Sequence, residues 1–287
     1  MHVMSVSRPK FRTKCWPVVK PIQHQLAPAT YPDRFPELVG SLDETVSLFA
    51  SYKKLMKNIH LTTIDAITFD AVGTLIVPTP SVGEIYAEEL SKMGHNIPPK
   101  IIEERFSLSF RAFKKDYPQR LLNRESWREI VSVILKGLTP EEDIDNLFAI
   151  LWNTFTRTER WRLLPGVLST LQHLSQKELR LFVLSNNDER LHAILHGLGI
   201  ARYFEKIFVS AELGAEKPST IIFKRVEDSI RVQAKKILHV GDSLSEDIQG
   251  ALQSGWNAAL ISSVPDDCQM AYPIEKANSI EELFSRI

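Results

Sequence analysis

The chain carries short runs of apolar, β-favouring residues, separated by longer stretches with apolar side chains at helical spacing. The first run begins near Ile64 and ends at Asp70. Four more runs follow, at 181–184, 206–209, 237–240 and 258–261. Apolar runs of this length are typical of strands that are buried on both faces. Because strands that alternate with helices indicate right-handed βαβ crossovers, the pattern predicts an α/β fold with a Rossmann-like parallel sheet.

A long helical interval lies between the first and second predicted strands. Apolar residues recur at helical spacing over about 82–93, from Pro98 past Phe113, and over 124–135 and 141–156. Within the second of these stretches, Phe106, Phe110 and Phe113 share one helix face, and this spacing favours packing over ligand binding. We therefore predict an all-helical domain at 81–160, inserted into an α/β core that comprises 61–80 and 161–287.

The first 60 residues are predicted to be an N-terminal extension that is partly disordered and holds one helix. Residues 1–32 carry five basic and no acidic side chains together with five prolines, a density that prevents regular structure. The single helix is predicted at 41–57, where Ser41 supplies the N-cap. A basic, acid-poor start also suits an organelle transit peptide, although the prolines interrupt the helix that such a peptide forms.

Composition and charge narrow the classes of function. The chain is 44% hydrophobic and 24% charged, as in ordinary globular proteins, and its 35 basic and 35 acidic side chains cancel. No global field would attract nucleic acid or an anionic membrane, and no apolar run reaches the ~20 residues that cross a bilayer. Cys15 and Cys268 lie far apart and match no metal or redox spacing, which fits a reducing compartment. We expect a cytoplasmic protein with a small-molecule substrate and without nucleic-acid or membrane partners.

Polar side chains with complementary chemistry follow the predicted strands. They are Asp70 and Thr74 after the first strand, Ser185 and Asn186 after the second, Lys217 after the third, and Asp242 and Asp247 after the fourth. The carboxyl ends of parallel strands open on one edge of the sheet, so these groups are expected to converge. Carboxylates suit a hard cation such as Mg²⁺, whereas Ser, Asn and Lys supply donors for an anion. One carboxylate could attack an electrophile held beside the cation.

These residues resemble the four motifs of the haloacid dehalogenase-like (HAD) hydrolases, in particular the subgroup with a helical cap inserted after the first strand. The motifs are Asp70-Ala71-Val72-Gly73-Thr74, Ser185-Asn186, Lys217-Pro218 and Gly241-Asp242 with Asp247. The resemblance covers about residues 62–287.

The resemblance implies a role for each motif. Asp70 would be the nucleophile that forms an aspartyl intermediate. Mg²⁺ would be bound by Asp70, the backbone carbonyl of Val72 and Asp242, with Asp247 completing or supporting the shell. The residues that would hold the phosphoryl group or neutralise Asp70 are Thr74, Ser185, Asn186 and Lys217.

Val72 departs from the pattern of the phosphatases in this family, which usually carry a second aspartate there as the acid and base. Such assistance is worth about 10²- to 10⁴-fold in rate. The first of three readings is a Mg²⁺-dependent phosphatase acting on a small phosphorylated metabolite, with another proton donor such as Asp188 or with a good leaving group. The second is a metal-independent 2-haloacid dehalogenase, whose first motif also lacks the second aspartate. The third is a catalytically degenerate domain that binds a phosphorylated ligand or a protein.

The cap is expected to determine the substrate. A 2-haloacid dehalogenase uses a cap arginine to receive the halide, and the sequence holds no arginine between Asp70 and Arg105. Cleavage of phosphonates, which in related enzymes needs a cap lysine, is a minor alternative. Five cap arginines could hold a second anionic group, but solvated helix faces are the favoured interpretation for most of them: Arg105, Arg111, Arg120, Arg124 and Arg128.

Overall fold

A computed structural model describes residues 61–262 and 275–286. The predicted N-terminal extension at 1–60, including its helix at 41–57, lies outside the described residues. The same holds for the two cysteines, Cys15 and Cys268.

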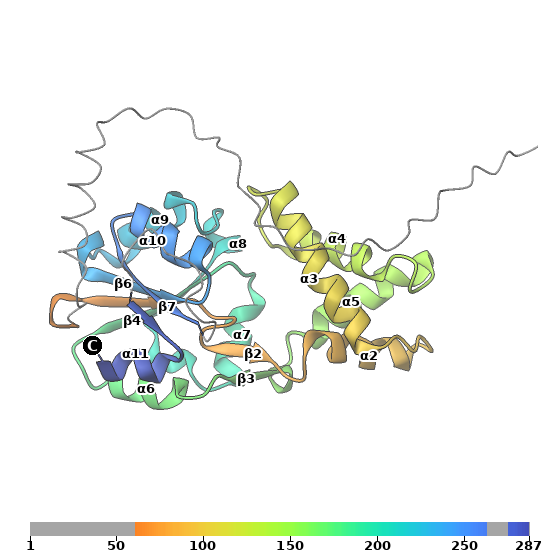
Figure 1. Ribbon diagram of the computed structural model, residues 1–287, viewed down its shortest axis with the longest axis horizontal. Coiled ribbons are helices and arrows are strands. Elements are labelled where there is room, and N and C mark those ends of the chain that lie inside the picture. Colours follow the sequence, from red (N-terminus) through yellow and green to blue (C-terminus); the bar gives the residue numbers. More distant parts are fainter. Residues whose placement is uncertain (1–60, 263–274, 287) are drawn as a thin grey trace, which may run out of the picture. The chain divides into compact units, whose positions relative to one another are not determined.

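The core is a six-stranded, all-parallel sheet with the strand order β5-β4-β1-β6-β7-β8 (Figure 1). Every residue of the central strand β1 is buried, as expected for a strand covered on both faces. The strands are β1 (Ala66–Phe69), β4 (Arg180–Ser185), β5 (Lys206–Val209), β6 (Ile237–Gly241), β7 (Asn257–Ile261) and β8 (Glu275–Ala277). In the register, Phe69 of β1 lies opposite Val183 of β4 and Val240 of β6, so these three strands end side by side. The predicted parallel α/β fold is confirmed.

Helices cover both faces of this sheet (Figure 1). One apolar cluster joins a sheet face to α6 (Val167–Leu174), α7 (Arg190–Gly197) and α11 (Ile280–Arg286). A second cluster joins the other face to α8 (Ser210–Leu213), α9 (Thr220–Ile230) and α10 (Gly250–Gln253). A π-helical turn at Leu244–Gln249 leads into α10. At the carboxyl edge of the sheet the strands run into the segments that connect them to these helices. The predicted site residues lie at this edge.

Four α-helices lie between Pro78 and Trp161, within the interval that separates β1 from β4. They are α2 (Val82–Lys92), α3 (Pro99–Asp116), α4 (Arg124–Leu135) and α5 (Ile144–Thr154), and we call this group the cap. Local signals fix where they start, because Ser81 and Glu84 form a capping box on α2 and the Asn123 side chain accepts from the Ser126 N–H on α4. Their apolar faces form a cluster of their own, centred on residues such as Ile102 and Ile134. The cap thus has its own apolar core.

The sequence pattern missed several short elements. A two-stranded antiparallel ribbon of β2 (Ile76–Pro78) and β3 (Trp161–Leu163) leads into and out of the cap. Strand β8 and helices α8 and α11 also went unpredicted. Three-residue strands and helices of one or two turns are too short to display a period, so tertiary packing determines them.

Candidate active site

Asp70 follows β1 directly and has only 7% of its surface exposed. Its Oδ1 accepts a hydrogen bond of 2.7 Å from the Lys217 ammonium. Burial raises the pKa of Asp70. The positive charge of Lys217 lowers this pKa and the negative charge of Asp247 raises it, so that the net shift is upwards. A carboxylate in this position is poorly hydrated and in contact with one cation.

Lys217 joins two of the site's carboxylates. Its ammonium donates to Asp70 Oδ1, to Asp247 Oδ1 at 2.5 Å and to the Leu184 carbonyl at 2.9 Å. Burial alone would lower the pKa of Lys217, but the carboxylates of Asp247 and Asp70 outweigh burial and raise it. Lys217 therefore stays protonated and holds Asp70 in one orientation.

Asp247 is buried in the π-helical turn Leu244–Gln249 that follows β6. Its carboxylate also accepts from the Ser243 N–H at 2.9 Å and lies 3.1 Å from His239 Nε2, while His239 Nδ1 lies 2.8 Å from the Thr68 hydroxyl. Burial would raise the pKa of Asp247, but Lys217 and His239 hold it well below its usual range. Gly241 makes room for this arrangement, since a Cβ there would lie 2.2 Å from the Asp247 carboxyl. Asp247 is thus ionised and fixed in place.

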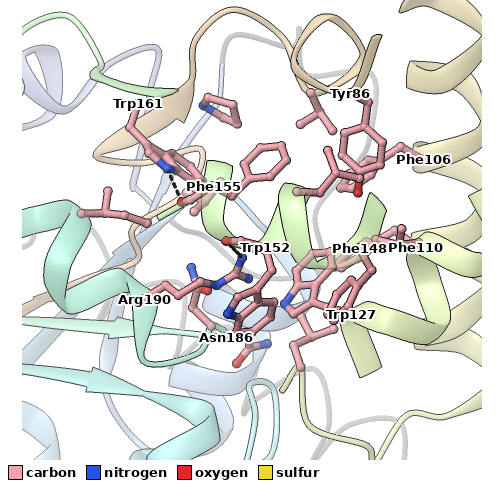
Figure 2. Close-up of a pocket in the computed structure, with 18 residues that line it drawn as sticks. Tyr86, Phe106, Phe110, Trp127, Phe148, Trp152, Phe155, Trp161, Asn186 and Arg190 are labelled. Atoms are coloured by element: carbon pink, nitrogen blue, oxygen red, sulfur yellow. Dashed lines mark hydrogen bonds between the residues drawn. The ribbon is translucent and has the colours of Figure 1, made fainter. Parts of the chain in front are cut away.

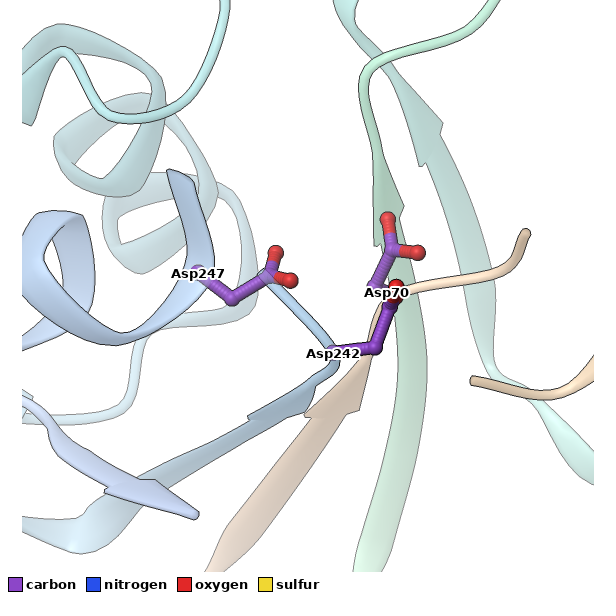
Figure 3. A group of neighbouring side chains, drawn as sticks. All are labelled: Asp70, Asp242 and Asp247. Atoms are coloured by element: carbon purple, nitrogen blue, oxygen red, sulfur yellow. The ribbon is translucent and has the colours of Figure 1, made fainter. Parts of the chain in front are cut away.

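Asp242 is the exposed member of the same group, which Figure 3 shows together. Its Oδ1 accepts a hydrogen bond of 3.1 Å from the Thr74 hydroxyl. Its carboxyl packs against Gly73, which has φ +97° and where any Cβ would collide with Asp242. Desolvation by the surrounding protein, together with the charges of Asp70 and Asp247, raises the pKa of Asp242 to about 7.

The donor set of Asp70, Asp242 and Asp247 fits a hard divalent cation. One carboxylate oxygen from each residue lies within 4.8 Å of the other two. Among the described residues, Lys217 is the one cation in direct contact with this group, since burial lowers the pKa of His239 and keeps its ring neutral. Three carboxylates against one ammonium leave negative charge that a bound divalent cation would offset.

Asn186 and Ser185 lie at the same sheet edge with different surroundings. The Asn186 side chain accepts from the Lys217 N–H at 2.8 Å and donates to the Lys217 carbonyl at 2.9 Å and to Glu246 at 3.0 Å. Asn186 therefore fixes the loop that carries Lys217. The Ser185 side chain is buried at the end of β4, and within the described chain its hydroxyl makes no hydrogen bond to protein.

Two residues bear on the missing acid: Val72, which stands in its position, and Asp188, which the sequence suggested as a replacement proton donor. Val72 is 37% exposed at the mouth of a cavity that Asn186 also lines. Asp188 is fully buried and pairs with Arg190 through two hydrogen bonds of 2.8 and 2.7 Å. A carboxylate held by a bidentate guanidinium is a poor proton donor, so the geometry argues against Asp188 in that role.

The cavity beside Val72 has a volume of about 330 Å³ and is lined mainly by the cap (Figure 2). Phe106 and Phe110 stack on each other and on Trp127 in its wall, whereas Phe113 is buried in the cap core. The interpretation of the aromatic stripe as packing was therefore right for Phe113 and incomplete for the other two. None of the five cap arginines lines the cavity.

Sequence reasoning missed four charged or titratable residues around the site. They are His239, Glu246, Arg190 and Glu216. Most of their partners lie elsewhere in the chain, so no local pattern identifies their place in the site. The spacing of Asp188 and Arg190 could nevertheless have suggested their ion pair. For His239, a polar residue inside an otherwise apolar strand was the available signal.

A parallel sheet with an aspartate at the end of its central strand, a lysine bridge and three convergent carboxylates is the arrangement expected of a haloacid dehalogenase-like hydrolase. The sequence matches the haloacid dehalogenase-like hydrolase family over residues 64–255, and the chain belongs to that family. A curated relative, the mouse haloacid dehalogenase-like hydrolase domain-containing protein 3, is 28% identical over 232 residues, which cover 78% of this chain and 92% of the mouse protein.

Solved structures share the fold at lower identity. The HAD-hydrolase YfnB of Bacillus subtilis, bound to magnesium, has a TM-score of 0.63 at 20% identity and covers 78% of this chain and 98% of its own. A HAD phosphatase from Thermococcus onnurineus has a TM-score of 0.54 at 21% identity, over 78% and 96%. The L-2-haloacid dehalogenase of Xanthobacter autotrophicus has a TM-score of 0.59 at 18% identity, over 77% and 96%. The fold thus hosts both reaction classes.

Among the described residues, no helix has the length and apolar character needed to cross a membrane.

Proposed function

We propose that this protein is a Mg²⁺-dependent phosphatase that hydrolyses a small phosphate monoester through an aspartyl-phosphate on Asp70. The observation that carries the proposal is the group of Asp70, Asp242 and Asp247 with Lys217 bridging two of them. Three carboxylates at one site suit a reaction that uses a divalent cation and a dianionic substrate, whereas displacement of a halide requires neither.

The residues of the chain support a two-step transfer. An Asp70 oxygen attacks phosphorus, and the ester oxygen leaves with the electron pair of the broken P–O bond. Water then attacks the phosphorus of the aspartyl-phosphate, which releases inorganic phosphate and restores Asp70. Lys217 orients Asp70 throughout, and the Ser185 hydroxyl, which has no protein partner among the described residues, supplies a donor for a phosphoryl oxygen.

The proposed Mg²⁺ would be held by the carboxylates of Asp70 and Asp242 and by the Val72 carbonyl, with Asp247 supporting the shell. When bound, it would offset negative charge on the phosphoryl group. Thr74 would fix Asp242 through its hydroxyl. Asn186 would act indirectly, because both ends of its amide hold the backbone of Lys217.

The alternative of a 2-haloacid dehalogenase rests on Val72, since a departing halide needs no proton. An assay of the purified full chain separates the two functions. We expect slow hydrolysis of p-nitrophenyl phosphate that requires Mg²⁺ and falls by at least about 10³-fold in Asp70→Asn. Asp65→Asn is the matched control, because Asp65 is an exposed acid paired with Lys236 beside the same strand.

Each outcome of the assay has a distinct meaning. Halide release from 2-chloropropionate that persists in EDTA would replace the phosphatase by the dehalogenase. If neither substrate reacts while phosphate with Mg²⁺ raises the Tm, the domain binds a phosphorylated ligand without turnover. Equal phosphatase rates for wild type and Asp70→Asn would contradict the role of Asp70.

A further inference from the structure

The cavity of about 330 Å³ adjoins the loops that carry the proposed site. Val72 and Asn186 belong both to the site loops and to the cavity wall, Asn187 follows in the same loop, and Arg190 begins α7. A ligand held at Asp70 would therefore extend past Val72 into this cavity. The volume lies at the small end of the range for ligand pockets, about 300 to 1,000 Å³.

Eight of the 18 residues that line the cavity are aromatic. Figure 2 shows rings from the cap and from the ribbon that leads out of it, arranged around one space. The aromatic wall residues are Tyr86, Phe106, Phe110, Trp127, Phe148, Trp152, Phe155 and Trp161. Rings of this kind bind apolar and flat groups through burial of apolar surface and through offset or edge contacts.

The described residues of the wall carry almost no charge to attract a second anion. The one charged side chain among them, Arg190, is neutralised by the two hydrogen bonds to Asp188 and is stacked on Trp152, with 3.5 Å between Cζ and the ring centroid. Tyr86 stays neutral because burial raises the pKa of its hydroxyl. A polar sugar or a second carboxylate would lose its hydration in this cavity and gain few partners in return.

A buried donor in the wall also lacks a partner. Among the described residues, the Trp127 indole N–H has no hydrogen-bond acceptor, although it is shielded from solvent. Buried N–H groups without acceptors are uncommon in folded proteins. This N–H has almost no accessible surface, so the cavity presents the apolar surface of its wall to a ligand rather than this donor.

We propose that the cavity receives the organic part of the substrate and that this part is uncharged and predominantly aromatic, as in an aryl phosphate. The inference rests on the proposed phosphatase function and adds the substrate class. An aryl phosphate substrate is compatible with a valine at position 72. An aryl oxide is a weaker base than an alkoxide, so it needs less help from an acid when it leaves. The missing acid and the aromatic cavity thus point to the same kind of ester.

Binding can be measured without turnover. The probes are 1-naphthylmethylphosphonate, methylphosphonate and phosphonoacetate, added with Mg²⁺ to the full-length wild-type protein, which cannot cleave their P–C bonds in the phosphatase reaction. Tryptophan fluorescence reports the cavity, because Trp127, Trp152 and Trp161 line it. We expect the naphthyl probe to bind at least tenfold more tightly than methylphosphonate, which corresponds to about 1.4 kcal/mol. Equal affinities for the naphthyl and methyl probes would overturn the inference. So would tighter binding of phosphonoacetate, which carries a carboxylate in addition to the phosphonate.

A pair of variants on one helix tests the wall itself. Phe110→Ala removes a ring from the cavity, whereas Leu108→Ala removes an exposed side chain from the same helix. Phe110→Ala should weaken binding of the naphthyl probe about tenfold and leave the affinity for methylphosphonate unchanged. Leu108→Ala should alter neither affinity. If Phe110→Ala fails to fold, Phe110→Leu takes its place and should show a smaller loss of the same sign. Unchanged naphthyl affinity in a folded Phe110 variant would refute the assignment.

The two proposals fail in different ways. If the naphthyl probe binds and quenches fluorescence but no phosphate ester is hydrolysed, the cavity assignment stands and the phosphatase function is wrong. If the protein hydrolyses 1-naphthyl phosphate and glycerol phosphate with equal kcat/KM in a reaction that needs Asp70, the phosphatase function stands and the aromatic substrate class is wrong.

Discussion

Val72 stands where phosphatases of this family usually carry the aspartate that acts as acid and base, so the proposed reaction lacks that group. It is exposed at the cavity mouth, so a polar side chain there would face solvent and ligand without disrupting the core. We expect Val72→Asp to raise kcat for an alkyl phosphate by about 10- to 10²-fold, within the range for general acid catalysis, and to raise it less for an aryl phosphate. Steady-state kinetics with glycerol phosphate and 1-naphthyl phosphate measure both effects.

The matched control for this substitution is Val72→Asn, which has nearly the same size and polarity but no exchangeable carboxyl proton. A gain with aspartate alone would identify proton transfer as the bottleneck. An equal gain with asparagine would attribute the effect to polarity, and no gain with either would mean that another group already protonates the leaving oxygen.

Asp242 makes the stability of the cation-free protein depend on pH. Its pKa is about 7 in the folded chain against 3.8 as the ordinary value, so the folded state binds this proton more strongly than the unfolded state does. Without a divalent cation, the contribution of Asp242 to stability should therefore rise as pH falls from about 7 towards 3.8. We expect Asp242→Asn to raise the Tm in EDTA at pH 7.5, because it removes a repelled carboxylate.

Mg²⁺ should reverse the effect of this substitution. The wild-type Tm should rise on addition of Mg²⁺, and the Asp242→Asn Tm should rise much less, since one of the three carboxylates is lost. A scan of Tm from pH 5 to 8, with and without Mg²⁺, tests both signs. A lower Tm for Asp242→Asn in EDTA would contradict the charge crowding described for the site.

At the scale of elements, one loop connects the cap to Asp70. Glu216, between α8 and α9, accepts from the Leu122 N–H at 2.6 Å and pairs with Lys114 near the end of α3. The next residue, Lys217, holds Asp70. The contact between cap and core and the orientation of Asp70 therefore depend on adjacent residues of a single loop.

Lys114→Gln should loosen this contact without touching the proposed site. We expect KM for an aryl phosphate to rise several-fold with a smaller change in kcat, because the charge-assisted bond is worth about 1.5 to 3 kcal/mol and acts on cap closure. Hydrogen exchange at 121–123 should also become faster. The control is Lys115→Gln, an exposed neighbour on the same helix. Similar kinetics for the two variants would show that the Lys114 contact does not hold the cap.

At the scale of the whole molecule, local patterns predicted five of the six strands of the sheet, the four cap helices and the residues that approach Asp70. Asp70, Lys217 and Asp247 could be placed at one edge because strand polarity alone brings strand ends together. The bridging role of Lys217 could not be predicted, since it depends on partners 147 and 30 residues away. The cavity was also hidden, because an apolar residue at helical spacing has the same pattern whether it packs in a core or lines a pocket.

The separate apolar clusters of sheet and cap predict that the two can lose structure independently. Ile134 belongs to the cap cluster and Leu171 to a cluster on the sheet, and both side chains are fully buried. Truncation of either to alanine should cost about 2 to 5 kcal/mol. Because the clusters are separate, Ile134→Ala should speed hydrogen exchange mainly within 82–154, whereas Leu171→Ala should speed it in the sheet strands and their helices. Exchange that rises equally in both regions for each variant would mean that cap and sheet unfold as one cooperative unit.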